Sequence, residues 1–175
     1  MNIRRFWGAA LLALPLAAFA EDAKDLFAAA AAGKIERVES LLAQGLDANG
    51  KIDQDRTALM AASFNGNIRI VKTLLAYGAD VNLADKLGAT ALTDAVMFGN
   101  PDLVGVLIAA GANVNAADAQ GVKVLDKAKK LGRDNIVKLL EAAGAKAQEA
   151  KAEEVTPSEP QAEANSEAKP EEPKK

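Results

Sequence analysis

Apolar and polar positions repeat along this chain with a period of 33 residues, without insertion, from about residue 23 to residue 145. Within each period, a Leu-x-x-Ala pair is followed by a Val-x-x-Leu pair. Because residues three or four apart share one helix face, each pair predicts a short helix with one buried side. The equivalent positions are Leu26, Leu59, Leu92 and Leu125; Ala29, Ala62, Ala95 and Ala128; Val38, Val71, Val104 and Val137; and Leu41, Leu74, Leu107 and Leu140.

Two glycines per period stand where the predicted helices end. The first set is Gly33, Gly66, Gly99 and Gly132, and the second is Gly45, Gly78, Gly111 and Gly144. Glycine closes helices because it adopts left-handed backbone angles without strain. The pattern predicts an all-α solenoid of four helix-turn-helix units, at about 23–49, 52–82, 85–115 and 118–145, each burying its apolar side against its neighbours.

The third unit carries the clearest family pattern. Its residues are Asp85 to Leu92, then Ala95, Gly99, Val104, Leu107, Gly111-Ala112 and Asn113-Val114-Asn115. With the parallel positions of the other units, this stretch resembles the ankyrin repeat over about residues 23–145. The resemblance implies an ankyrin-repeat solenoid of four 33-residue units with short connecting hairpin turns. The family's usual Thr-Pro-Leu-His start is replaced here, for example by Thr57-Ala58-Leu59-Met60.

Residues 1–20 have the pattern of a secretory signal peptide. Arg4 and Arg5 precede an apolar run, and Ala18-Phe19-Ala20 forms a small-x-small cleavage site. We expect cleavage after Ala20, no stable membrane insertion afterwards, and a periplasmic location, with extracellular release as the alternative. At the other end, residues 146–175 are rich in Ala, Glu, Lys and Pro. Such a composition offers too little apolar surface to offset the chain entropy lost on folding, so we expect a disordered tail.

The composition narrows the possible chemistry. The chain contains no histidine and no cysteine, so imidazole catalysis, thiol nucleophiles and zinc sites of the usual kind are unavailable. We expect no cofactor, no metal and no enzymatic activity. An enzyme using Asp53 and Asp55 as a carboxylate pair is the alternative considered, and exposure on a turn argues against it because neither carboxyl would be desolvated.

Two sets of polar residues recur in the connections. They are Asp47, Asp80 and Asn113, and Asn49, Asn82 and Asn115. Oxygen-bearing side chains between residues 47 and 56 raise the alternative of a calcium site, but the spacing does not match an EF-hand and the closing glutamate is missing. We therefore interpret both sets as turn formers that hydrogen-bond their own backbones.

Charge and aromatic content argue against nucleic acid as a partner. The formal net charge of −3 becomes −5 when Arg4 and Arg5 are removed with the signal peptide. An acidic chain is a poor ligand for phosphate backbones. The single tryptophan, Trp7, lies in the predicted signal, so the mature chain lacks the aromatic platforms that bind single strands. We expect a monomer whose partner is another protein.

The ankyrin resemblance implies that a partner docks against the turn tips and the concave face of the first helices. At those positions stand Asp53, Gln54, Arg56, Phe64, Asn65, Lys86, Leu87, Ala89, Met97, Phe98, Ala119, Gln120, Val122, Lys130 and Leu131. Several of these are apolar, and an exposed apolar patch often marks a protein-binding site. Phe64, Phe98 and Leu131 have a second interpretation, in which they fill gaps between stacked units.

The fourth unit is rich in lysine and arginine. It is either a solvated cap of the array or a basic patch for an acidic partner. Taken together, the sequence predicts a non-enzymatic protein-binding module of the bacterial cell envelope. Some bacterial periplasmic ankyrin proteins are associated with oxidative-stress defence, and the resemblance suggests that role. A secreted effector that binds a host protein is the alternative.

Overall fold

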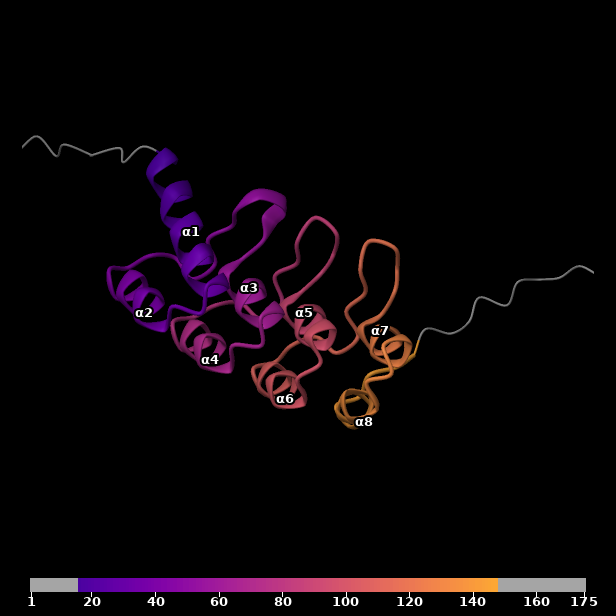
Figure 1. The fold of residues 1–175 in the computed structure, drawn as a ribbon. Helices are drawn as coiled ribbons and strands as arrows, with labels where there is room; N and C mark the ends of the chain where they lie inside the picture. The colour runs from indigo at the N-terminus through magenta and orange to yellow at the C-terminus, as the bar shows by residue number, and fades with distance from the viewer. Residues whose placement is uncertain (1–15, 148–175) are drawn as a thin grey trace, which may run out of the picture.

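The computed structural model describes residues 16–147, which form pairs of antiparallel helices stacked side by side (Figure 1). The first helix of each pair is α1 (Leu16–Ala31), α3 (Ala58–Phe64), α5 (Ala91–Phe98) or α7 (Val124–Lys130). The second is α2 (Ile35–Ala43), α4 (Ile68–Ala76), α6 (Pro101–Ala109) or α8 (Asp134–Ala142). The predicted all-α repeat fold is confirmed.

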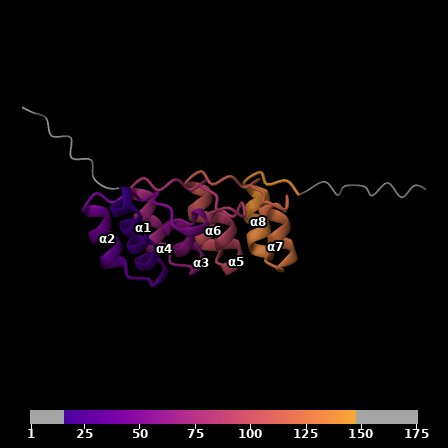
Figure 2. The same cartoon turned by 90° about the horizontal axis from the view of Figure 1, so that it is seen from above.

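The pairs form two rows of helices. First helices contact one another in the order α1, α3, α5, α7, and second helices in the order α2, α4, α6, α8. Seen from above, the helices of the two rows lie alongside one another from one end of the array to the other (Figure 2). Each pair therefore contacts its neighbours through both of its helices.

The core lies where the repeat predicted it. Leu26, Leu59, Leu92 and Leu125 are each 1% exposed, and the equivalent alanines and second-helix leucines are also buried. Among the equivalent valines, Val137 alone is half-buried, because it belongs to the last described pair. The alanines keep facing first helices close together, since they add little bulk between them.

The glycines close the helices as expected. All eight glycines of the two predicted sets have φ between 65° and 90°, in the left-handed region. Gly66 also allows close packing, because a side chain there would collide with the ring of Phe98 in the next unit. Phe98 thus fills a gap between units, as one of its two interpretations predicted, while remaining about half exposed.

Between successive pairs, the chain rises into hairpin loops that project above the first helices (Figure 1). We call them finger 1 (residues 51–57), finger 2 (84–90) and finger 3 (117–123). Each is closed by an antiparallel bridge between its end residues: Lys51 with Thr57, Ala84 with Thr90, and Ala117 with Lys123.

The fingers are joined side by side through their backbones. Lys86 N donates to Gln54 O at 3.0 Å, and Ala119 N donates to Leu87 O at 2.9 Å. A finger is therefore held by its neighbour as well as by the helices below it.

The two recurring polar sets play different roles. Asp47, Asp80 and Asn113 accept a hydrogen bond from the backbone two residues on, as predicted, at 2.8–3.0 Å. For Asn49, Asn82 and Asn115 the prediction of self-bonding was wrong. Asn82 Nδ2 donates to Gly111 O at 3.1 Å and Asn82 Oδ1 accepts from Asn113 N at 2.8 Å, so this side chain clips one unit to the next.

Asn49 and Asn115 make the same two contacts with the following segment. Asn49 bonds Gly78 O and Asp80 N, and Asn115 bonds Gly144 O and Lys146 N. The longest of these distances, 3.4 Å, is from Asn115 Nδ2 to Gly144 O. We call the three side chains the asparagine clips. They could not be distinguished from turn formers in the sequence, because the segment that they bond lies about 30 residues further along.

At the N-terminal end, α1 runs across the expected cleavage point after Ala20. Most of the predicted signal peptide, residues 1–15, lies outside the described residues, as does the predicted tail beyond residue 147. None of the helices between residues 16 and 147 combines the length and the apolar character needed to cross a membrane.

The asparagine clips yield a stability prediction. Replacing Asn82→Ala removes two hydrogen bonds to the next unit and should lower the free energy of unfolding by about 1–2 kcal/mol in urea titrations. Asn135→Ala is the matched control, since Asn135 is exposed and its side chain makes no hydrogen bond to another described residue. If both variants unfolded at the same urea concentration as the wild type, the clips would contribute nothing to stacking.

Candidate functional site

A hollow of about 340 Å³ opens between the fingers and the first helices of the middle of the array. We call it the central groove. It is lined by Arg56, Phe64, Asp85, Leu87, Ala89, Thr93, Asp94, Met97, Asp118, Gln120 and Lys127. These residues belong to fingers 1, 2 and 3 and to α3, α5 and α7, so the groove exists because units of different sequence are stacked in register.

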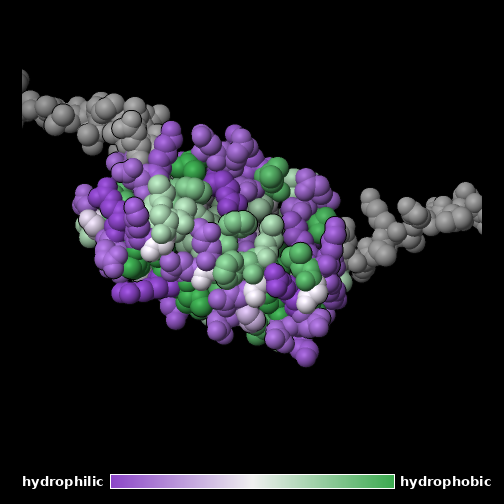
Figure 3. Space-filling view, viewed as in Figure 1, coloured by the Kyte–Doolittle hydropathy of each residue, from purple (hydrophilic) through white to green (hydrophobic). Residues whose placement is uncertain are grey.

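Apolar side chains dominate the accessible part of the groove. Phe64 is 49% exposed, Leu87 is 63% exposed and Met97 is 48% exposed. Phe64 and Met97 occupy equivalent positions at the carboxyl ends of α3 and α5, and Leu87 stands at the tip of finger 2. Figure 3 shows hydrophobic surface gathered across the middle of the molecule, over the row of first helices.

The charged residues of the groove form ion pairs, some of which cross the boundary between the second and third units. Arg56 leaves finger 1 and places Nη1 3.2 Å from Asp85 Oδ2 and Nη2 3.0 Å from Asp94 Oδ2. Further along, Lys127 Nζ lies 2.7 Å from Asp118 Oδ2. Arg56 thereby ties finger 1 to finger 2 and to α5, and Lys127 ties finger 3 to α7 beneath it.

Asp85 and Asp118 also build the fingers themselves. Asp85 Oδ1 accepts from the backbone N–H groups of Leu87 and Ala89, both at 2.9 Å. Asp118 Oδ1 makes the same two bonds in finger 3, to Gln120 and Val122. The Lys127 ammonium and, to a lesser extent, these backbone donors hold the pKa of Asp118 below its usual value, although partial burial opposes them.

Finger 1 is built differently. Ile52 occupies the position of the aspartate in the other fingers. Finger 1 therefore lacks the carboxylate that accepts hydrogen bonds from the backbone N–H groups of the turn. Gln54 and Asp55 both adopt positive φ, 62° and 60°, where finger 2 uses Gly88 at one of the two positions. Side chains in this region carry backbone strain. The tip of finger 1 is thus less well supported than the other two.

Asp94 is the unusual residue of the site. It is 3% exposed, and burial raises its pKa to about 6 although Arg56 opposes the shift. Asp85 raises the pKa of Asp94 further and Lys127 lowers it, both by smaller amounts. Arg56 Nη2 is close to Asp94 Oδ2, yet this oxygen accepts no well-aligned hydrogen bond. Desolvation of the carboxylate is therefore only partly compensated.

The structure brings together six of the fifteen contact residues that the sequence predicted. Those lining the central groove are Arg56, Phe64, Leu87, Ala89, Met97 and Gln120. Asp53, Gln54 and Lys86 are exposed on fingers 1 and 2, and Phe98, Lys130 and Leu131 are exposed at the carboxyl ends of α5 and α7. In finger 3, Val122 N donates to Asp118 Oδ1, and Ala119 N donates to Leu87 O of finger 2. Asn65 Nδ2 donates to Ala31 O of the preceding unit at 2.8 Å.

Sequence reasoning missed the buried charges of the groove. Asp94 stands at a position where the preceding units have Ala28 and Ala61, so a charge at a small-residue position was the available signal. Asp85 belonged to the family pattern but was not expected to contact Arg56. The paired carboxylates proposed as the enzyme alternative, Asp53 and Asp55, lie on finger 1 outside the groove lining.

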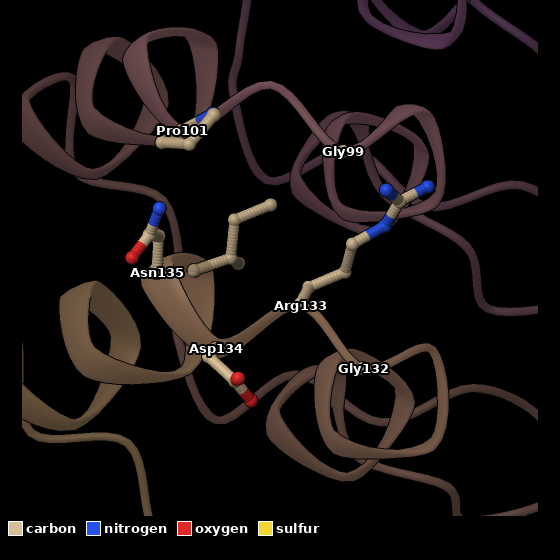
Figure 4. A pocket seen from close by; sticks show the side chains of 7 residues that line it. Gly99, Pro101, Gly132, Arg133, Asp134 and Asn135 are labelled. Carbon is tan, nitrogen blue, oxygen red and sulfur yellow. The ribbon is translucent and has the colours of Figure 1, made fainter.

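A second hollow, of about 320 Å³, lies between the third and fourth helix pairs (Figure 4). Arg133 extends over Gly99, where any side chain would collide with the guanidinium, and its Nη2 is 3.5 Å from Met97 O. Its Nε is buried without a hydrogen-bond partner. Asn67 and Asn100 cap α4 and α6 at the same position, whereas Arg133 provides no such cap for α8. Arg133 therefore fills space between units.

No described segment gathers three or more acidic side chains in an arrangement that could hold a metal ion. In the basic fourth unit, two lysines are paired: Lys127 with Asp118, and Lys129 Nζ with Glu141 Oε1 at 3.2 Å. Lys130 and Lys138 are exposed to solvent there, which agrees with the interpretation of this unit as a solvated cap.

The fold and groove define a class of protein: a helical repeat array whose finger side presents apolar residues to solvent. Comparison with family models finds a match over residues 26–118 to the model described as ankyrin repeats, 3 copies. This chain belongs to the ankyrin repeat family. The matched range ends before α7, although the helix pair α7 and α8 stacks on the others in the same way. No curated protein matches the chain.

The titration of Asp94 gives a testable prediction. A carboxyl whose pKa is raised by folding binds more protons in the folded state than in the unfolded state between the two pKa values, so folding becomes more favourable as pH falls through that range. From a folded pKa of about 6 against an ordinary 3.8, the wild type should gain about 1 kcal/mol relative to Asp94→Asn between pH 7 and pH 5.

Asp118→Asn is the matched control for that measurement. Because the pKa of Asp118 is lowered by folding, its contribution to stability is lost only as pH falls through the lowered value. The difference between wild type and Asp118→Asn should then stay constant from pH 7 to pH 5. A constant difference for Asp94→Asn over the same range would show that Asp94 is not desolvated as described.

Proposed function

We propose that this chain is a non-enzymatic module that binds a protein through the central groove and the surrounding finger side. Ankyrin repeats are generally protein-interaction modules and typically non-enzymatic, and the chain has no histidine or cysteine to support common catalytic chemistries. The proposal names the surface that binds: the wall formed by fingers 1–3 and the first helices α3, α5 and α7.

One observation carries the proposal. Within the described residues, seven large hydrophobic side chains are exposed: Phe64, Tyr77, Leu87, Met97, Phe98, Leu131 and Leu139. Five of them, all except Tyr77 and Leu139, lie on finger 2 or at the carboxyl ends of first helices. Apolar surface concentrated on one side costs solubility, which makes a binding role the better explanation. Their exposure of about half or more also favours contact over gap filling for Phe64 and Leu131.

Substitution of the groove rim tests the proposal. The double variant Leu87→Ser with Met97→Ser should abolish capture of the partner that the wild-type chain retains from its own cells, read by affinity purification and mass spectrometry. Because both side chains are substantially exposed, the free energy of unfolding should change by only about 1 kcal/mol or less.

The control is a second double variant, Tyr77→Ser with Leu139→Ser, which removes the same kind of exposed side chain from the second helices. It should capture the partner as the wild type does. If the control lost the partner and the groove variant kept it, binding would belong to the second-helix side.

We propose further that the chain acts in the periplasm after removal of residues 1–20. The support is the basic, apolar and small-residue pattern that precedes Glu21. Cleavage there would leave Glu21 and Asp22 as the first residues of α1, and acidic residues are favourable at a helix N-terminus. A role in oxidative-stress defence is a further part of this proposal and rests on family analogy alone.

Export is tested by fractionation and intact-mass measurement. We expect the chain in the periplasmic fraction with Glu21 as its first residue. Recovery in the culture medium would favour the effector alternative, and an uncleaved chain in the membrane fraction would contradict both.

A further inference from the structure

We propose that the central groove selects a partner segment that presents two neighbouring uncharged apolar side chains, and that it discriminates against charged side chains of either sign. The inference rests on the proposed function and specifies what the binding surface recognises. Its basis is that the charged side chains lining the groove are already in ion pairs with one another.

Every charged side chain that lines the groove is in an ion pair with another lining residue. Arg56 is shared between Asp85 and Asp94, at 3.2 Å and 3.0 Å, and Lys127 is held by Asp118 at 2.7 Å. The carboxylates lie beneath their cations, with side-chain exposures of 5–9% against 23–24% for Arg56 and Lys127. The lining holds three carboxylates and two cations, so one negative charge is unmatched. That charge is shared by Asp85 and Asp94, whose side chains are 5% exposed beneath Arg56, and a charged group from a partner cannot reach it without displacing the guanidinium.

A charged side chain entering the groove would therefore lose its hydration without reaching an accessible counter-charge. A cation would have to displace Arg56 from Asp94. The guanidinium would then keep only its contact with Asp85. An anion would have to draw Arg56 or Lys127 away from carboxylates that are almost fully buried. Displacing Arg56 in either way would remove the positive charge that offsets the desolvation of the Asp94 carboxylate. Its Oδ2 already accepts no hydrogen bond.

The uncharged surface that remains matches apolar side chains. Phe64, Leu87 and Met97 form the accessible rim, and no segment between residues 16 and 147 covers them. The groove volume of about 340 Å³ is roughly twice that of an engineered protein cavity of about 150 Å³ that holds one benzene molecule. Two large side chains, aliphatic or aromatic, would fill it. Methionine adapts to either shape because its side chain is unbranched and flexible.

A random 12-residue peptide library displayed on phage tests the proposal with the full-length chain immobilised. Peptides are first depleted on the Leu87→Ser, Met97→Ser variant, which keeps the same terminal segments, and then selected on the wild type. We expect enrichment of two adjacent or alternate uncharged apolar residues, with Lys, Arg, Asp and Glu depleted at the positions between and beside them. A parallel depletion on Tyr77→Ser, Leu139→Ser should leave no wild-type-selective peptides of this kind.

A synthetic peptide from the selected set then reports the role of charge. Its dissociation constant, measured by fluorescence anisotropy, should change less than about twofold between 50 mM and 500 mM NaCl, because contacts without net charge are not screened. Replacing either apolar residue of the peptide by Lys or by Glu should weaken binding at least about tenfold, the effect of about 1.4 kcal/mol.

Enrichment of basic or acidic peptides, strong salt dependence, or selection of nothing beyond what the groove variant retains would each overturn the inference. These outcomes are distinct from failure of the proposed function. A natural partner that is lost on Leu87→Ser, Met97→Ser but binds through charged residues would leave the binding surface correct and the inferred specificity wrong. A natural partner that is retained by that variant would contradict the proposed surface itself.

Discussion

The structure depends on contacts between neighbouring units, because no helix pair can bury its apolar side alone. Leu59 and Leu92 are buried only because a first helix lies on each side of them, and Ala62 and Ala95 allow those helices to approach. The stability of such an array is the sum of the stability of each repeat and the interaction energy between neighbouring repeats, and it does not come from one central core. The asparagine clips add a polar connection at each boundary, and hydrogen bonds join finger 1 to finger 2 and finger 2 to finger 3.

The same constraint explains why a site could form without disturbing the fold. Stacking fixes the inward positions of each unit and leaves the finger tips and the outer turns of the first helices free to vary. In this chain the free positions hold Phe64, Leu87 and Met97 as an apolar rim, and Arg56, Asp94 and Lys127 as part of the wall. These residues come from three successive units, so register between units is what assembles them. A shift of one unit against the next would separate Arg56 from both of its carboxylates.

The sequence predicted the array well because the same signal occurs four times. The equivalent leucines, alanines and glycines identify the buried helix faces and the helix ends, and the structure places them there. What failed were inferences about single residues that act across a unit boundary. Asn82 looks like a turn residue, and its true acceptor, Gly111 O, lies in the following unit. Asp94 and Arg56 each look like an isolated surface charge. Their pairing depends on how far finger 1 leans over α5, a geometry that hydrophobic periodicity does not encode.

The central claim is that the stacked units form one binding surface, the central groove, and that a partner protein binds there. Hydrogen–deuterium exchange of the chain, free and bound to the partner that it captures, measures this most directly. The account predicts slower exchange on binding in finger 2 and at the carboxyl ends of α3 and α5, with the amides of α4 and α6 unchanged. Slower exchange confined to α4 and α6, with finger 2 unaffected, would contradict it.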